Sequence, residues 1–167
     1  MTSVILLLGS NDKAAAAIIE RAIAVVELTI GDVVRRSGEY TSAPYGFTAE
    51  RGFVNRAIEV VCDIDAYEVL RRINLIEALM GRNREEERRI RMARGEQYAS
   101  RPIDIDIVYY GDERYDDARL TIPYHYLDER EYALRPVVEI APDRQHPALG
   151  RTPREMLEAL TRDDNNN

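Results

Sequence analysis

The chain has 167 residues, with 45% hydrophobic and 32% charged side chains, which is the length and composition of one ordinary globular domain. Its net charge of −7 argues against a strongly basic nucleic-acid-binding domain, and its single cysteine excludes an internal disulfide or a cysteine-rich metal site. No apolar run approaches the roughly 20 residues of a membrane-spanning helix, and the first residues do not resemble a signal peptide. We therefore expect a cytoplasmic protein with a single domain over residues 1–161 and a disordered polar tail over 162–167.

The first half of the chain alternates between strand and helix patterns. An unbroken apolar run at residues 4–8 is typical of a buried strand, and apolar residues at helical spacing follow it. Turn chemistry at Pro44 and Gly46 separates two further strands. Asp65, with Glu68 three residues later, resembles a capping box and favours a helix start. Together these patterns predict strands over 4–8, 33–41 and 53–63, and helices over 12–28 and 66–81.

Residues 82–101 break this pattern. The segment contains seven arginines and four glutamates, and we expect a long, charged and mobile loop of the kind that often covers a functional site. A strand follows over 103–109, then a short helix over 127–134, and a last helix opens at Thr152 and Pro153. The order β-α-β-β-α-β with C-terminal helices predicts an α+β protein of the ferredoxin-like arrangement, an antiparallel sheet with helices packed on it.

Two aspartates on the strand over 103–109 form the clearest chemical motif. Alternate side chains of a strand point to the same side, so Asp104 and Asp106 share one face while isoleucines fill the other. Neighbouring carboxylates stay ionised together only when a cation compensates their charge. Mg²⁺ usually binds one or two carboxylates and completes its coordination with water and substrate phosphates. A solvated acidic strand face would give the same pattern, but the arginine-rich segment just before it favours a metal and phosphate site.

The aspartates belong to an ordered series of motifs. Residues 101–108 have the pattern Arg-x-x-Asp-hydrophobic-Asp-hydrophobic-hydrophobic. Six other motifs are Leu8-Gly9-Ser10-Asn11, Tyr40-Thr41-Ser42-Ala43-Pro44-Tyr45-Gly46, Phe53-Val54-Asn55, Glu77 with Gly81-Arg82-x-Arg84, Leu120-Thr121-Ile122-Pro123 and Glu139-Ile140-Ala141-Pro142. In this order, over about residues 5–150, the chain resembles the 6-hydroxymethyl-7,8-dihydropterin pyrophosphokinase family of folate biosynthesis.

Enzymes of that family move the β,γ-pyrophosphate of ATP to the hydroxymethyl oxygen of the pterin and release AMP. The resemblance implies that Asp104 and Asp106 hold two Mg²⁺ ions, that cationic side chains hold the transferred group, and that the 82–101 segment closes to exclude water. The implied catalytic residues are Arg82, Arg84, Arg101, Asp104 and Asp106. The implied ATP-binding residues are Leu70, Glu77, Arg82, Arg84, Ile107, Arg119, Thr121, Tyr124, His125 and Arg130.

A pterin is flat and carries donors and acceptors along one edge, so it calls for stacked aromatic rings and an amide that both donates and accepts. The resemblance implies that Phe53 and Tyr132 stack on the ring and that Asn55 binds its edge. Phe53 and Asn55 are two positions apart on a predicted strand and therefore share a face. Backbone groups of Ser42, Ala43 and Tyr45 complete the implied pterin site.

The chain departs from the family at three points. Where the family usually has a histidine that contacts the nucleotide phosphates, this chain has Tyr124 followed by His125, and the role stays open between them. The 82–101 segment is unusually long and lacks the tryptophan often found there, for which Tyr98 is a candidate substitute. Ala99-Ser100 replaces a Gly-Pro that commonly precedes the signature arginine, so closure of the segment would differ.

Two alternative functions remain open at this point. A degenerate family member could bind pterin or ATP without turnover, as the change at Tyr124 would allow. A ferredoxin-like RNA-binding module could use the arginine-rich segment, but such domains stack bases on strand aromatics, and this strand presents Asp104 and Asp106. We expect small-molecule partners, ATP and 6-hydroxymethyl-7,8-dihydropterin, with no nucleic acid and no membrane. We also expect a monomer, because no heptad pattern or large exposed apolar face is apparent.

Overall fold

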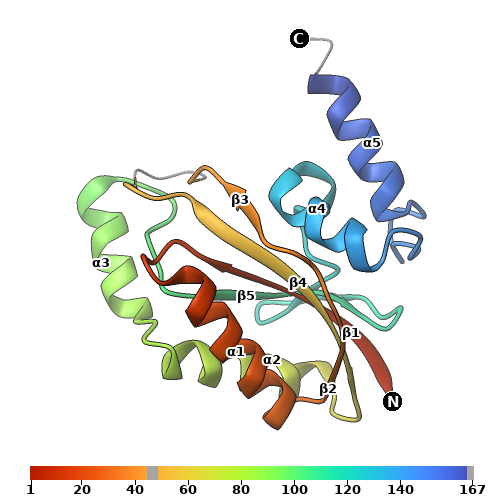
Figure 1. Cartoon of the computed structure of the whole chain (residues 1–167), viewed down its shortest axis with the longest axis horizontal. Coiled ribbons are helices and arrows are strands. Elements are labelled where there is room, and N and C mark those ends of the chain that lie inside the picture. The colour runs from red at the N-terminus through yellow and green to blue at the C-terminus, as the bar shows by residue number, and fades with distance from the viewer. Residues whose placement is uncertain (45–48, 165–167) are drawn as a thin grey trace.

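A five-stranded antiparallel sheet runs through the centre of the protein (Figure 1). Its strands are β1 (Thr2–Ser10), β2 (Asp32–Arg36), β3 (Tyr40–Ser42), β4 (Phe53–Cys62) and β5 (Asp104–Tyr110). The structure is a computed structural model and describes residues 1–44 and 49–164. The hydrogen-bonded order is β2-β4-β1-β5, and β3 pairs with β4 beyond the end of β2. A separate short hairpin consists of β6 (Tyr115–Asp116) and β7 (Thr121–Ile122).

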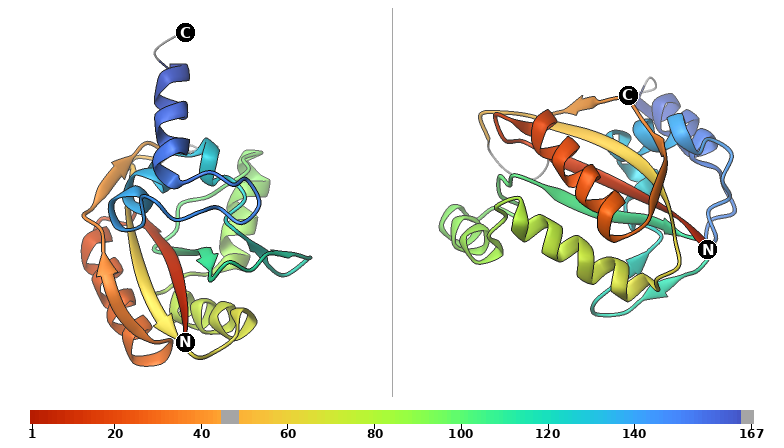
Figure 2. Two further views of the ribbon diagram at one scale, coloured as in Figure 1. Left: turned by 90° about the vertical axis from the view of Figure 1, so that its right-hand side faces the viewer. Right: turned by 60° about the horizontal axis from the view of Figure 1, so that its bottom comes forward.

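Helices cover both faces and one end of the sheet. They are α1 (Ala15–Thr29), α2 (Ala66–Leu79), α3 (Arg84–Arg94), α4 (Glu131–Ile140) and α5 (Pro153–Asp164), with a 3-10 turn at Leu127–Glu129. The helices α1 and α2 pack on one face, α4 and α5 contribute to the core on the other, and α3 stands at one end of the sheet (Figures 1 and 2). No helix within the described ranges is long and apolar enough to cross a membrane.

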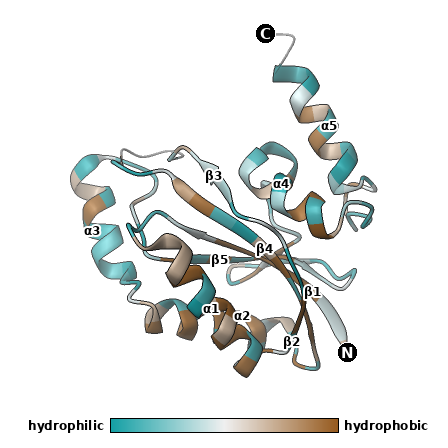
Figure 3. Ribbon diagram, viewed as in Figure 1, coloured by the Kyte–Doolittle hydropathy of each residue, from teal (hydrophilic) through white to brown (hydrophobic). Residues whose placement is uncertain are grey.

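The alternation of side chains along β1 divides the interior into two apolar cores. Val4, Leu6 and Leu8 pack with residues of α1 and α2. Ile5 and Leu7 point the other way and pack with residues of α4 and α5. All five are at most 3% exposed, so both faces of this strand are covered, which explains its unbroken apolar sequence. Figure 3 shows the contrast with α3, which is mainly hydrophilic.

The sheet has the ferredoxin-like α+β arrangement that the sequence predicted. Every neighbouring pair of its strands is antiparallel, and α1 and α2 provide the two connections of the β-α-β-β-α-β order. The helices α4 and α5 are the expected C-terminal additions. In this register Gly9, near the end of β1, lies opposite Asn55 of β4 on one side and opposite Asp104 of β5 on the other. The topology therefore brings three separate sequence motifs to one place.

The prediction of a mobile loop over 82–101 is wrong for its central part, which forms helix α3. The Asn83 side chain caps this helix by accepting a hydrogen bond from the Glu86 N–H at 3.1 Å. Gly95 ends it in the left-handed conformation, with φ of 66°. Acidic residues in the first turn and arginines in the last turn complement the helix dipole. The helix lacks an apolar stripe, and its one buried side chain is the carboxylate of Glu87.

Three other boundaries differ from the predictions. The strand expected over 33–41 is split into β2 and β3, because Ser37 leaves the regular ladder. Its N–H donates to the Ala57 oxygen at 2.8 Å, and its own Oγ accepts from the Ala57 N–H at 2.9 Å. The helix expected over 127–134 is instead a 3-10 turn followed by α4. Helix α5 continues to Asp164, into the segment predicted as a disordered tail.

The chain between α4 and α5 is folded around the ring of His146. The Nδ1 atom accepts hydrogen bonds from the N–H groups of Ala148 at 3.1 Å and Leu149 at 3.0 Å. An imidazole that is protonated on both nitrogens cannot accept these bonds. Burial lowers the pKa of His146, Asp128 opposes that shift, and Arg114 adds to it.

We therefore predict that the free energy of unfolding falls as the pH is lowered from about 7 to about 5. The unfolded imidazole takes up a proton near its ordinary pKa of 6.5, whereas the folded one does so only at lower pH. The stability that neutral His146 contributes is thus complete above that value and is lost as the pH falls through the folded pKa. Urea denaturation of His146→Asn, which keeps an acceptor but does not titrate, should show a smaller pH dependence. His125→Asn is the control. The prediction would be contradicted if the free energy of unfolding changed equally with pH in the wild type and in His146→Asn.

Candidate active site

A cavity of about 300 Å³ opens on the α4 face of the sheet, at the end of β1. Side chains from β4 and β5 enter it because alternate positions of both strands point to this face. Arg82, the segment around α3 and residues 124–132 supply its walls. The cavity has a charged half beside β5 and an aromatic and amide half beside β4.

Asp104 and Asp106 point into the charged half from β5, as the sequence predicted. The neighbouring isoleucines pack into the opposite core. Burial and the adjacent Asp104 carboxylate raise the pKa of Asp106 well above its ordinary value. Burial acts on Asp104 too, but the guanidinium groups of Arg101 and Arg82 outweigh it and lower the pKa of Asp104. The arginines thus compensate one carboxylate and leave the other in need of a cation.

Arg82, which follows α2, is the centre of a buried ion-pair network. Its side chain is 7% exposed. The Nη1 atom donates to Glu77 Oε1 at 2.9 Å and to Asp104 Oδ1 at 2.8 Å. The Nε and Nη2 atoms donate to the two carboxylate oxygens of Glu87 at 2.8 Å and 3.2 Å. Pairing of this kind is what allows a guanidinium to stay buried.

Glu77 connects α2 to β5 within this network. Its side chain is 2% exposed, and Oε1 also accepts a hydrogen bond from the Ile105 N–H at 2.8 Å. The Oε2 atom accepts from Arg84 at 2.5 Å. Burial raises the pKa of Glu77, and the charge of Arg82 opposes the shift. The contacts of this carboxylate are therefore with the protein itself, and its ATP-binding role stays a prediction.

Arg101 lies between the two halves of the cavity. Its guanidinium is 5.3 Å from the ring centre of Phe53 and 5.7 Å from that of Tyr98. It also donates to Asp104 Oδ2 at 3.1 Å. Asn11, directly after β1, fixes the backbone here, because its Oδ1 accepts from the Arg101 N–H at 3.0 Å. The signature arginine is thus held against both the aromatic and the acidic side.

The residues predicted to bind the pterin meet in the second half of the cavity, apart from Tyr45, which lies outside the described residues. The Asn55 side chain donates to Ser42 Oγ at 2.9 Å, which orients its amide. Tyr132 lines the cavity from α4. The predicted residues that line this half are Ser42, Ala43, Phe53, Asn55 and Tyr132.

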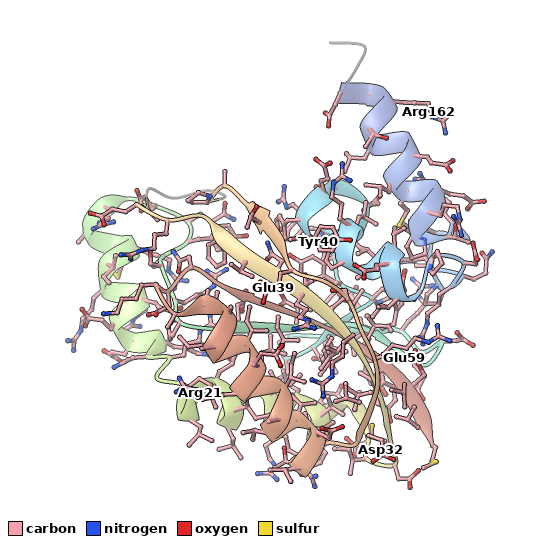
Figure 4. The ribbon with its side chains drawn as sticks, in the orientation of Figure 1. Arg21, Asp32, Glu39, Tyr40, Glu59 and Arg162 are labelled. Atoms are coloured by element: carbon pink, nitrogen blue, oxygen red, sulfur yellow. The ribbon has the colours of Figure 1, made fainter. Side chains whose placement is uncertain are left out.

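The position of β3, which carries Ser42, is fixed by α4. Glu139 accepts hydrogen bonds from the Gly38 N–H at 3.1 Å and 3.0 Å and from the Tyr40 hydroxyl at 2.7 Å. Figure 4 labels Tyr40 in the space between β3 and α4. The Glu139-Ile140-Ala141-Pro142 motif of the sequence therefore supports the cavity wall from outside the cavity.

Gly9 forms the floor between the two halves. A Cβ atom at this position would lie 3.1 Å from Asn55 Oδ1 and 3.6 Å from Phe53 Cδ1. The absence of a side chain keeps open the space between the Asn55 amide on β4 and the Asp104 carboxylate on β5. The sequence motif around Gly9 pointed to the site, but its spacing alone did not predict this role.

The structure separates the two candidates at positions 124 and 125. Tyr124 is half-buried and lines the cavity, and its hydroxyl is 3.1 Å from that of Tyr132. Burial and, to a smaller extent, the charge of the nearby Asp106 raise the pKa of Tyr124, so its hydroxyl stays protonated. His125 is exposed and does not contribute to the cavity lining.

Besides Glu77, Arg84 and His125, four of the predicted ATP contacts lie away from the cavity lining. Leu70 and Ile107 belong to the core under α1 and α2. Arg119 lies over a tyrosine ring of α2, 4.8 Å from its centre, and Thr121 is exposed on β7. Arg130, in contrast, lines the cavity. The ATP-binding role of all five positions stays a prediction.

Sequence analysis missed several residues that the fold brings to the site. Asn11 was named only as part of a motif, and its hydrogen bond to the Arg101 backbone was not predicted. Arg91 and Tyr126 line the cavity and carry no motif. Glu87, in a run of three glutamates, had no sequence signal that distinguished it from its exposed neighbours.

Comparison with known proteins assigns the chain to a family. Residues 5–142 match the family model described as 7,8-dihydro-6-hydroxymethylpterin-pyrophosphokinase. The chain is 35% identical over 161 residues to 2-amino-4-hydroxy-6-hydroxymethyldihydropteridine pyrophosphokinase of Methylorubrum extorquens, a match that covers 96% of this chain and 94% of that protein. It is 32% identical to the protein of the same name from a Synechocystis species, over 85% of this chain and 68% of that one.

A solved structure of HPPK-DHPS from Plasmodium falciparum has the same fold, with a TM-score of 0.76 and 16% identity. The match covers 99% of this chain and 45% of the other, so this chain spans less than half of that protein. With the family match and the relatives above, the chain belongs to the 7,8-dihydro-6-hydroxymethylpterin-pyrophosphokinase family.

Proposed function

We propose that the chain transfers the β,γ-pyrophosphate of ATP to the hydroxymethyl oxygen of 6-hydroxymethyl-7,8-dihydropterin, with release of AMP, as a step of folate biosynthesis. The single observation that carries the proposal is one cavity of about 300 Å³ with two unlike halves. Arginines and a carboxylate pair suit a metal-bound polyphosphate, and the aromatic and amide half suits a flat heterocycle. The two halves meet where the two substrates would exchange the group.

Two Mg²⁺ ions fit the carboxylate pair. Asp104 and Asp106 offer oxygen ligands on one face, and burial beside Asp104 makes the ionised form of Asp106 costly without a cation. When bound, the metal would neutralise polyphosphate charge and polarise the attacking hydroxyl. The donor set suits a hard cation that completes its coordination with phosphate oxygens and water.

The reaction needs positioning and charge stabilisation more than covalent help from the protein. A bond forms between the hydroxymethyl oxygen and the β-phosphorus while the bond from that phosphorus to the α-phosphate oxygen breaks, the hydroxyl proton is lost, and AMP leaves. Phe53 and Tyr132 hold the pterin ring and Asn55 fixes its edge, which aims the hydroxyl at the phosphorus. Arg82 and Arg101 offer donors to the transferred group.

Tyr124, and not His125, is the better candidate for the phosphate contact at this position. Its hydroxyl lies in the cavity beside the carboxylate pair and stays protonated, whereas the imidazole of His125 is exposed. A neutral hydroxyl can donate one hydrogen bond to a phosphate oxygen. We also keep the sequence-based expectations of a monomer and of a cytoplasmic location. The RNA-binding alternative has no support from the site.

The proposed reaction is tested by AMP release from ATP, Mg²⁺ and 6-hydroxymethyl-7,8-dihydropterin. We expect AMP and the pterin diphosphate in equal amounts, and only when all three components are present, because the acceptor hydroxyl is the nucleophile. Controls lack the pterin or contain EDTA. Binding of both substrates without AMP formation would favour the degenerate-member alternative.

We predict that Asp106→Asn lowers kcat/KM at least about a hundredfold, because it removes a metal ligand. The folded protein should not lose stability in the absence of metal. The substitution replaces a carboxyl group, whose ionisation in this site is unfavourable, with a neutral amide. Turnover and urea denaturation in EDTA measure the two effects. The matched control is Asp116→Asn on the exposed strand β6. Near-normal turnover in Asp106→Asn would contradict the metal assignment.

We predict that Gly9→Ala raises the KM for the pterin about tenfold and changes the affinity for ATP much less. The added Cβ would lie 3.1 Å from Asn55 Oδ1, so the amide must move, and overpacking of this kind costs about 1–3 kcal/mol. Gly38→Ala is the control for the glycine change itself, because its Cβ would be 3.6 Å from the nearest atom, an oxygen of Glu139. An unchanged KM for the pterin in Gly9→Ala would show that the floor of the cavity is not a pterin contact.

A further inference from the structure

The Glu87 side chain occupies one complete edge of the Arg82 guanidinium. Its two carboxylate oxygens accept from Nε at 2.8 Å and from Nη2 at 3.2 Å, which is the two-pronged geometry with which arginine also binds phosphate. The remaining nitrogen, Nη1, is bound by Glu77 and Asp104. An incoming phosphate would therefore find four of the five Arg82 N–H groups already bound to carboxylates.

The three carboxylates that bind Arg82 differ in how firmly they are held. Glu77 is anchored to β5 by the Ile105 N–H at 2.8 Å and also accepts from Arg84, and Asp104 belongs to the sheet itself. Glu87 belongs to α3, and it is the buried residue of that helix. Its release from Arg82 requires that α3 moves away from the end of the sheet, which also breaks the contact of the exposed Arg84 side chain, at the start of α3, with Glu77.

The ion pairs of Glu85 and Glu86 contribute little to holding α3 in place. Within residues 1–44 and 49–164, Glu85 and Glu86 pair with arginines of the same helix, at 3.6 Å to 3.9 Å, and all of these groups are more than half exposed. Exposed pairs of this kind contribute little to stability. The buried pair of Glu87 with Arg82 and the more exposed pair of Arg84 with Glu77 thus hold α3 against the cavity wall.

We propose that Glu87 is a positioning residue that acts through Arg82 as an internal competitor of the ATP phosphates. Glu87 holds Arg82 in the absence of nucleotide. When ATP binds, its phosphate group displaces Glu87 from Arg82, and α3 moves together with Glu87. This inference rests on the proposed function, because it requires that the ligand of Arg82 is the polyphosphate of ATP. It explains why the one buried side chain of this charged helix is a carboxylate.

The first test measures affinity for the Mg²⁺ complex of α,β-methylene-ATP. In this analogue a methylene carbon replaces the oxygen between the α- and β-phosphorus atoms, so the pyrophosphate cannot be transferred. Glu87→Gln keeps the size of the side chain and removes the competing charge, so we expect the Kd to fall about five- to tenfold. Glu86→Gln, an exposed neighbour on α3, is the matched control with an unchanged Kd. If Glu87 only supported Arg82, its substitution would weaken binding instead.

A second measurement uses the wild-type chain and needs no variant that must fold. Hydrogen exchange of the α3 amides should become faster when the chain is saturated with the same Mg²⁺ complex, because Glu87 leaves Arg82. Exchange that slows or stays the same would overturn the proposal, as would a folded Glu87→Gln variant with an unchanged or raised Kd. If the wild type does not bind the complex at all, the nucleotide function itself fails, and this inference fails with it.

Discussion

The buried guanidinium of Arg82 is the interaction on which the architecture of the site depends. It joins α2, α3 and β5 through Glu77, Glu87 and Asp104. Burial of an ion costs several kcal/mol unless partners compensate it, so these elements must stay together as long as Arg82 is enclosed. The same dependence makes the site responsive, because an anion that enters can take the place of a carboxylate without leaving the cation uncompensated. In the proposed mechanism, the donor atoms that stabilise the free protein are thus the same ones that recognise a polyphosphate.

The sheet supplies the rest of the geometry through its two-residue alternation. Asn55 on β4 and Asp104 on β5 both face α4 because each lies opposite Gly9 of β1. The apolar positions that alternate with them on these strands enter the core under α1 and α2, so the site cannot shift by one residue without exposing the core. The strand positions that form both halves of the cavity are consequently fixed by the fold, while α3 is held beside them by side-chain ion pairs.

Much of the fold and part of the site followed from sequence because period-two patterns report directly on strand faces. Asp104 with Asp106, and Phe53 with Asn55, were placed on shared faces by spacing alone. Helix α3 was missed because its signals are polar: Asn83 caps it and Gly95 ends it, but no apolar stripe marks it. The burial of Glu87 was beyond prediction, since it results from a contact with Arg82 across a turn and not from any local pattern.

The choice between Tyr124 and His125 shows how backbone pairing decides function where residue type does not. The Tyr124 N–H donates to the Val108 oxygen at 3.0 Å, which aligns this segment with β5. With the backbone fixed in this way, Tyr124 lies in the cavity and the next residue, His125, is exposed. Burial raises the pKa of Tyr124, so the group that lies beside the carboxylates is a neutral donor over the whole physiological range. A histidine there would gain or lose its charge within that range, whereas Tyr124 brings no such change of charge next to the carboxylate pair.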